Sequence, residues 1–314
     1  MDFLYLLIAC LFFSVQFLFQ KNFQKNTRGG FAVSLWNQFA VYLCMALYLA
    51  VKTRSFAVNG TALLYSVLYA VSGLSCSIAS LFAMRYGKVS AVSGFCLAGG
   101  MVLPFFYGIF WLGESVTVLK IAGILVLCAS LIPSLCEKDP SGKARSRSDF
   151  IKYTLLSLVV FCGNGFVSIF SKAHQISPNA IGTDEFVLLN AVVCLTITGV
   201  GMLILTAVTG ARGDKKPFRT VFYELAAGPM VPKVFLLCVA MTACYALCNG
   251  LGNIFSLRCA LTMDSSIQFP LLSGIVIFLT AILGWLCFRE KIGKNNLISL
   301  ALTVVGITLF TIPA

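Results

Sequence analysis

Ten long runs of apolar residues, separated by short polar segments, make up most of the sequence. The runs are continuous and do not alternate, which predicts helices and not the strands of a barrel. Each run is close to the roughly 20 residues that a helix needs to cross a bilayer. We therefore expect an all-α integral membrane protein whose ten transmembrane helices lie near residues 3–20, 31–51, 62–84, 89–112, 117–135, 151–171, 186–209, 233–257, 265–288 and 295–312.

The composition indicates a chain that is embedded in lipid. Hydrophobic residues make up 59% of the 314 residues, charged residues make up 11%, and the mean hydropathy is +0.94. An ordinary soluble domain carries about 25% charged residues. The first run begins at Asp2 with no basic segment ahead of it, so we expect it to persist as a helix and not to be removed as a signal peptide.

Lysine and arginine are unevenly distributed among the segments that connect the helices. The connections after odd-numbered helices hold 18 of these residues, and those after even-numbered helices hold 5. Cytoplasmic loops carry an excess of Lys and Arg. The charge distribution therefore predicts a multi-pass protein of the cell (plasma) membrane with both termini on the extracytoplasmic side. It also explains the net charge of +12 without a nucleic-acid partner.

The sequence repeats itself in two halves. Matching positions are Lys21 with Lys172, Asn37 with Asn190, Arg85 with Arg258, and Glu114 with Glu290, at offsets from 151 to 176. The offset grows where the second half has a longer loop. Because five is an odd number of helices, the second half must be inverted relative to the first. We expect residues 1–136 to form one repeat, residues 137–149 a polar linker, and residues 150–314 the other repeat.

These features resemble the drug/metabolite transporter superfamily, of the EamA type. The resemblance rests on ten helices in two five-helix halves and on a Glu that precedes a Gly/Ser-rich helix in each half. The positions that carry it are Glu114 with Gly123 and Ser130, and Glu290 with Ser299 and Gly306. The resemblance implies a transporter fold and says little about the substrate. Ten-helix members of the family are described with cytoplasmic termini, whereas the charges here place both termini outside.

Polar side chains within the spans are candidates for lining a substrate cavity, because they are costly unless they face protein or water. The candidates are Gln16, Asn37, Ser90, Ser93, Asn164, Asn190, Asn249, Asn253 and Gln268. Asn249 and Asn253 are four residues apart and share one face of their helix. For the repeat-related Asn37 and Asn190, a hydrogen bond between packed helices is an equal alternative to substrate contact.

Two helices carry interruptions of the kind that transporters place near the bilayer midplane. Gly99 and Gly100 precede Pro104, which cannot donate to the carbonyl of Gly100, so we expect a kink there. Pro270 interrupts the ninth helix in a similar way. For Gly99 and Gly100, close packing of helices is an equally good explanation.

Charged residues lie mainly at the ends of the spans. Asp264 is either the cap of the ninth helix, which we favour, or a charged site. Glu114 and Glu290 are interpreted as solvated ion pairs or as caps for the next helix. Arg85 and Arg258 are expected to extend toward the interface.

The inverted repeat favours a secondary transporter of a small polar or zwitterionic metabolite, such as an amino acid, acting by alternating access, and we expect it to act in efflux. A cationic drug exporter is the first alternative, although no carboxylate lies inside the first helix of either half, as the small multidrug relatives would require. An enzyme is disfavoured because the chain has one histidine and no paired aspartates. A non-transporting scaffold is a further alternative. We expect no cofactor or metal, a lipid bilayer as surroundings, and a monomer or homodimer.

Overall fold

The computed structural model describes residues 2–26, 31–53, 55–86, 89–135, 147–211, 232–288 and 294–311. Over these ranges the chain forms ten helices and no strand, so the predicted all-helical fold is confirmed. The helices are α1 (Asp2–Asn26), α2 (Phe31–Thr53), α3 (Gly60–Tyr86), α4 (Val89–Trp111), α5 (Val118–Leu135), α6 (Arg147–Gln175), α7 (Thr183–Ala211), α9 (Pro232–Thr262), α10 (Ser265–Phe288) and α11 (Lys294–Thr311).

Eight of the described helices are long and apolar enough to cross a membrane, namely all except α5 and α11. The apolar parts of those two are shorter, Val118–Pro133 and Leu297–Phe310. Most of the predicted linker, together with the loop over 212–231 and Glu290, lies outside the described residues.

Several helices continue past charged residues at which we expected them to end. α9 reaches Thr262 although its expected end was residue 257, just before Arg258. The Arg258 guanidinium lies 3.2 Å from the carboxylate of Asp184. α6 likewise includes Lys172, whose ammonium group donates to backbone carbonyls. A charge with a partner does not need to leave the helix, so hydropathy alone places these ends too early.

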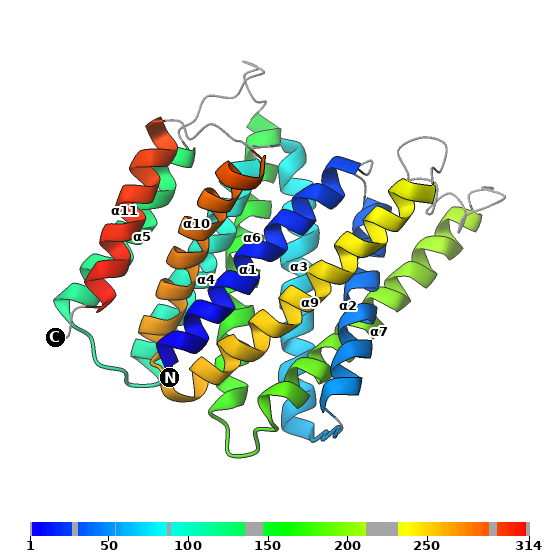
Figure 1. Cartoon of the computed structure of the whole chain (residues 1–314), viewed down its shortest axis with the longest axis horizontal. Coiled ribbons are helices and arrows are strands. Elements are labelled where there is room, and N and C mark those ends of the chain that lie inside the picture. The colour runs from blue at the N-terminus through cyan, green and yellow to red at the C-terminus, as the bar shows by residue number, and fades with distance from the viewer. Residues whose placement is uncertain are drawn as a thin grey trace.

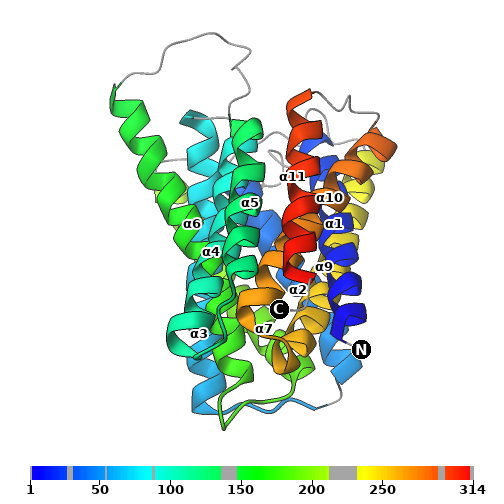
Figure 2. The same ribbon diagram turned by 90° about the vertical axis from the view of Figure 1, so that its left-hand side faces the viewer.

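Consecutive helices run in alternating directions, and the start of α1 and the end of α11 lie toward the same face of the molecule (Figures 1 and 2). We refer to this side as the terminal face. It also carries the connections from α2 to α3, α4 to α5, α6 to α7 and α9 to α10 (Figure 1). The prediction that both ends share one side agrees with this arrangement.

The helices pack mainly against partners from the other half of the sequence. α1 packs most extensively against α9, α3 against α6, α2 against α7, and α5 against α11. α4 lies between α6 and α10. One buried apolar cluster joins α2, α7 and α9, and another joins α1, α4, α5, α10 and α11. The two sequence halves are thus interleaved and do not form separate globules.

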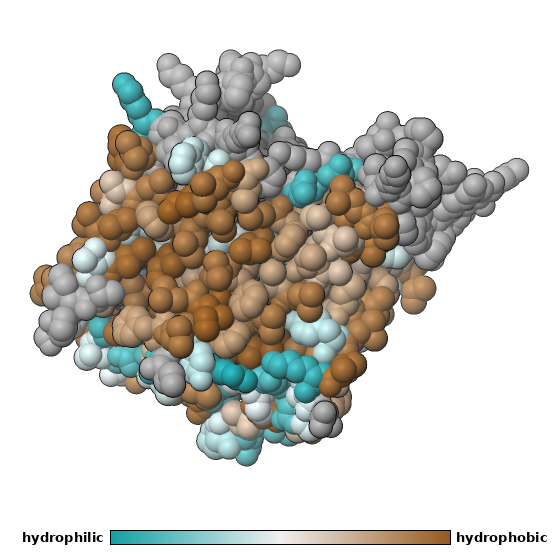
Figure 3. Space-filling view, in the orientation of Figure 1, coloured by the Kyte–Doolittle hydropathy of each residue, from teal (hydrophilic) through white to brown (hydrophobic). Residues whose placement is uncertain are grey.

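Apolar side chains also cover the outside of the molecule. A broad hydrophobic band covers the face of the molecule shown in the space-filling view, and hydrophilic residues gather at the terminal face (Figure 3). Val51 and Val118 are 81% and 82% exposed, and Trp111 at the end of α4 is 79% exposed. A soluble protein rarely exposes a continuous apolar surface of this extent. The band has the character of a surface that contacts lipid.

Candidate functional site

A chain of hydrogen-bonded amides crosses the centre of the helix bundle. Asn249 Nδ2 donates to Gln16 Oε1 at 3.0 Å, which joins α9 to α1. Asn253 Nδ2 donates to the backbone carbonyl of Asn249 at 2.8 Å, and the Tyr69 hydroxyl of α3 lies 3.5 Å from Asn253 Oδ1. The structure therefore brings together three residues that the sequence singled out, and adds a tyrosine that it did not.

Two more tyrosines and a cysteine lie beside this chain. Tyr42 of α2 lies beside Cys194 of α7. Tyr42 is also close enough to Tyr69 and to Tyr245 of α9 for their hydroxyls to interact electrostatically. All three tyrosines are half-buried. Sequence reasoning missed them because a tyrosine in an apolar run counts as apolar. Their position in the middle of the spans, away from the interfacial aromatic belt, was the available signal.

We call these residues, together with Asn190, the central polar layer. Its members are Gln16, Tyr42, Tyr69, Asn190, Cys194, Tyr245, Asn249 and Asn253. Each lies at least seven residues from both ends of its helix. Asn190 is one turn from Cys194 on the same face of α7. The layer contains amides, hydroxyls and a thiol, and no charged side chain.

The repeat-related pair Asn37 and Asn190 differ in their bonding. Asn37 Oδ1 accepts a hydrogen bond from Thr242 Oγ1 at 3.2 Å, which links α2 to α9. Asn190 is only 4% exposed, yet its Oδ1 has no hydrogen-bond partner among the described residues. A buried amide oxygen without a donor is destabilising. Asn190 therefore has a capacity for a hydrogen bond that the protein alone does not fill.

Other predicted residues pack helices together. Asn164 Nδ2 of α6 donates to the Cys96 carbonyl of α4 at 2.8 Å. A Cβ added at Gly99 would lie 1.9 Å from the Phe161 carbonyl oxygen, and one at Gly100 would lie 2.6 Å from Asn164 Nδ2. These two glycines allow α4 and α6 to approach closely, as small residues do in membrane helices.

The prolines and the remaining candidates belong to α4 and α10, which contribute no member to the central polar layer. α4 continues through Pro104 and α10 continues through Pro270. Gln268, fully buried in the first turns of α10, donates through Nε2 to the Ser256 carbonyl at 2.7 Å. Ser90 and Ser93 belong to α4, but their side chains lie outside the described residues.

A second polar assembly holds the turn between α9 and α10 at the terminal face. The Glu114 carboxylate, which follows α4, accepts hydrogen bonds from the backbone N–H groups of Ser265 and Ser266, each at 2.7 Å. Lys172 Nζ donates to the carbonyls of Ala260 and Met263 at 2.6 and 2.7 Å. The helix dipole favours an anion at the start of α10 and a cation at the end of α9. We call Glu114, Lys120 and Lys172 the α9–α10 clamp.

Two expectations about helix caps were wrong, namely that Glu114 caps the next helix and that the Asp264 side chain caps α10. Glu114 caps α10 and not the next helix, α5, where Thr117 Oγ1 instead accepts the Lys120 N–H at 3.3 Å. Asp264 precedes α10 and accepts the Gln268 N–H through its backbone carbonyl at 2.8 Å. Its carboxylate lies 3.6 Å from Lys120 Nζ. The capping carboxylate thus comes from a distant segment, which the sequence of the turn does not show.

Three helix ends are joined by ion pairs at the same face. Asp184, in the first turn of α7, lies 3.0 Å from Lys52 of α2 and 3.2 Å from Arg258 of α9. The neighbouring Glu185 accepts hydrogen bonds from the Ser55 hydroxyl at 2.7 Å and from the Gly182 N–H at 3.3 Å. These four charged side chains at the terminal face therefore have partners within the protein.

The single histidine of the sequence lies in the last turn of α6 and packs as part of the core. His174 is fully buried and its ring stacks on Phe186, with ring centroids 3.7 Å apart. Its Nε2 accepts the Ile181 N–H at 3.5 Å. The ring fixes the connection between α6 and α7.

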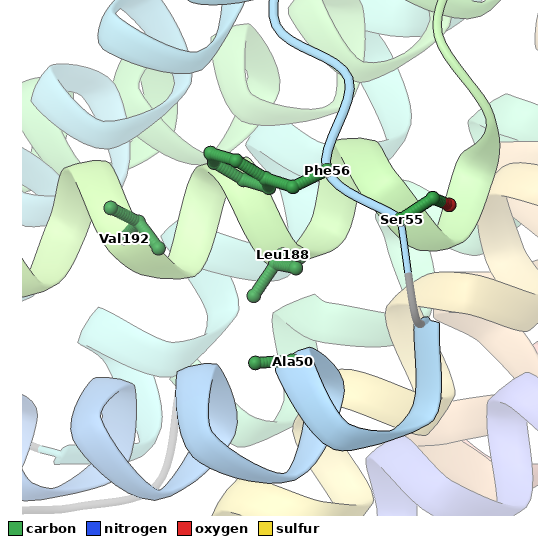
Figure 4. Close-up of a pocket in the computed structure, with 5 residues that line it drawn as sticks. All are labelled: Ala50, Ser55, Phe56, Leu188 and Val192. Atoms are coloured by element: carbon green, nitrogen blue, oxygen red, sulfur yellow. The ribbon is translucent and has the colours of Figure 1, made fainter.

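Figure 4 shows a pocket of about 330 Å³ between α2, the segment that follows it, and α7. Ala50, Phe56, Leu188 and Val192 give it apolar walls, and the Ser55 hydroxyl is already bonded to Glu185. It lies at the ends of these helices. This pocket is separate from the central polar layer and offers little for a polar ligand to bind.

Comparison with known proteins gives a fold and no family. No family model matches the chain. No curated protein matches it. A solved structure described only as "Crystal structure of protein" has a TM-score of 0.67 to this chain, with 12% sequence identity. The match covers 98% of this chain and 95% of the other. At that identity the likeness concerns the fold alone.

Proposed function

We propose that this protein is a secondary transporter that moves a small polar or zwitterionic metabolite across the plasma membrane by alternating access. In this proposal it has two inverted five-helix repeats, ten spans, extracytoplasmic termini and no enzymatic activity. It belongs with the EamA-type drug/metabolite transporters that its sequence resembles. The observation that carries the proposal is the symmetry of helix packing, together with a polar layer between the halves.

The packing pattern is nearly unchanged when the two halves are exchanged. Under the match of α1 with α6, α2 with α7, α3 with α9, α4 with α10 and α5 with α11, the main contacts map onto one another. α1 packs on α9 as α6 packs on α3, and α2 packs on α9 as α7 packs on α3. The pairs α2 with α7, α4 with α10, and α5 with α11 map onto themselves. Such a pattern is expected for repeats related by a twofold axis, which supports the inverted repeat.

The pair α5 and α11 supports the count of ten spans. Each has 18 residues and is therefore about 27 Å long, and its apolar part, Val118–Pro133 or Leu297–Phe310, covers most of that length. A Cβ at Gly123 would meet the Phe310 ring at 2.6 Å, and one at Gly306 would meet Leu127 at 2.7 Å. These glycines belong to the Gly/Ser pattern that marks the family resemblance.

The central polar layer lies where the halves meet. Its bonds from Asn249 to Gln16 and from Tyr69 to Asn253 each connect a helix of the first half with one of the second. Hydrogen bonds between two halves can be exchanged as the halves move, and a polar solute can replace them. The layer therefore suits a midplane site better than a permanent structural contact would. It holds no carboxylate of the kind that a cationic drug exporter would use.

Counterflow in proteoliposomes tests the proposal. Purified protein is reconstituted with internal unlabelled solute, and uptake of labelled amino acids, sugars, polyols, cations and phosphorylated metabolites is measured. We expect saturable uptake of at least one solute, reduced strongly in Asn249→Leu. Thr196→Val is the control, because Thr196 is exposed on α7 and bonds only its own helix at Val192. Absence of uptake for every solute by a monodisperse, helical protein would refute transport.

A further inference from the structure

The charge balance around the central polar layer limits what it can bind. Among its eight members none carries a formal charge. A bound solute with an ionic group would have to be desolvated there without a counter-ion, which is costly in a membrane interior. A solute with hydroxyl or amide groups can form hydrogen bonds with the amide and hydroxyl side chains of the layer.

Several charged side chains at the terminal face are already paired. Asp184 is bound between Lys52 and Arg258. Glu114 and Lys172 bind the ends of α10 and α9. For a charged solute to use these groups, it would have to break contacts that hold the helix ends. These paired charges therefore do not supply a free ionic partner.

Asn190 indicates which hydrogen-bonding group is missing. The free atom is Oδ1, an acceptor, so the absent partner is a donor. The residue is 4% exposed and one helical turn from Cys194, which lies close to Tyr42 and Tyr69. A solute that donates to Asn190 would therefore lie among the tyrosine hydroxyls, which can accept as well as donate.

We propose that the central polar layer binds an uncharged solute rich in O–H or N–H donors, of the polyol, sugar or small amide class, and that Asn190 Oδ1 accepts one of those donors. The inference rests on the proposed transport function. It narrows the substrate class from polar or zwitterionic solutes to uncharged ones. It depends on Asn190 together with the Tyr42 and Tyr69 hydroxyls.

Ligand-induced thermal stabilisation tests binding without requiring transport. The purified full chain is heated with myo-inositol, mannitol, glucose, urea, glutamine, choline or inorganic phosphate. A ligand that binds the folded state raises the unfolding temperature in proportion to its occupancy. We expect stabilisation by at least one of the four uncharged probes, with an affinity about tenfold lower in Asn190→Leu, since one hydrogen bond is lost. Thr196→Val on the same helix should match the wild type.

A second variant separates the site from general damage to folding. Asn190→Asp keeps the size of the side chain and its acceptor oxygens, so it should retain binding of the uncharged probe that Asn190→Leu weakens. Stabilisation of the wild type only by glutamine, choline or phosphate would overturn the inference, as would unchanged binding in both Asn190 variants. Stabilisation by none of the probes would overturn it as well.

Counterflow with the same probes shows which proposal has failed. If an uncharged probe stabilises the protein but is not transported, the proposed binding site is supported and the proposed transport function is refuted. Flux of glutamine or choline that is unaffected by Asn190→Leu would keep transport and reject the uncharged substrate class.

Discussion

Glu114 carries an interaction that joins distant parts of the chain. It follows α4, yet its two carboxylate oxygens bind the first N–H groups of α10. A carboxylate at a helix start compensates the dipole and satisfies amides that have no partner within the helix. The side chain therefore fixes where α10 begins, relative to the loop after α4.

We expect Glu114→Ala to destabilise the protein by about 1–3 kcal/mol, because two charge-assisted hydrogen bonds are lost. Glu114→Gln keeps one acceptor oxygen and should cost less. Thermal unfolding in detergent ranks the stabilities of the variants. Hydrogen exchange at the amides of Ser265 and Ser266 shows whether the destabilisation arises at the start of α10. Asp149→Asn is the control, since Asp149 is exposed and lies 4.0 Å from Lys152. Equal exchange in all variants would contradict the capping role.

Gly99 tests the close approach of α4 and α6. Gly99→Ala places a Cβ 1.9 Å from the backbone oxygen of Phe161, and backbone cannot move aside as a flexible side chain can. We expect destabilisation at or above the upper end of the 1–3 kcal/mol that is typical of overpacked sites, or loss of folded protein.

Gly60→Ala is the matched control for Gly99→Ala, because nothing lies within 4 Å of a Cβ added at Gly60. Yield and monodispersity in gel filtration compare the two variants. A Gly99→Ala protein as stable as Gly60→Ala would show that the helices are farther apart than described.

At the scale of helices, the turn between α9 and α10 is held from both sides by the clamp. Lys172 is 5% exposed and donates to two carbonyls at the end of α9. Lys172→Met keeps most of the apolar stem but leaves both carbonyls without this donor. We expect the free energy of unfolding to fall by about 2–3 kcal/mol and hydrogen exchange over residues 260–268 to become faster. Lys152→Met should change neither, because the side chain of Lys152 is 55% exposed.

The sequence predicts the helices well and their ends less well. Ten apolar runs match ten described helices, because the length of a run reflects the bilayer thickness. The ends at Arg258 and Lys172 were misplaced, since the partners that let these charges stay in a helix come from α7 and from the α9–α10 turn. Such partners are distant in the sequence and cannot be read from a local window.

The site was predictable to a similar extent and for the same reason. Asn249 and Asn253 share a face because of helical spacing, which the sequence contains. Their bonds to Gln16 and Tyr69 depend on how α9 packs against α1 and α3. The half-buried tyrosines became visible as a group only when α2, α3 and α9 were placed together.

For the molecule as a whole, the uneven distribution of Lys and Arg predicts which face is outside. We expect alkaline phosphatase fused after Ala314 to be active in a bacterial host, because this reporter folds only outside the cytoplasm. The same reporter inserted after Lys143, in a positively charged segment, should be inactive. The reverse pattern would place the terminal face, and with it the clamp, in the cytoplasm.

Asn37 has a hydrogen-bond partner and the Oδ1 of Asn190 has none, and this difference bears on the relative populations of the two end conformations of a transporter. Under the proposed alternating access, a conformation that releases the bond between Asn37 and Thr242 and fills the Asn190 acceptor would contain the same number of such bonds. One neutral hydrogen bond is worth about 1 kcal/mol, which corresponds to a ratio of about five between two conformations. The unliganded protein would then occupy both to measurable degrees, and a solute that fills the Asn190 acceptor would need to supply only a small bias.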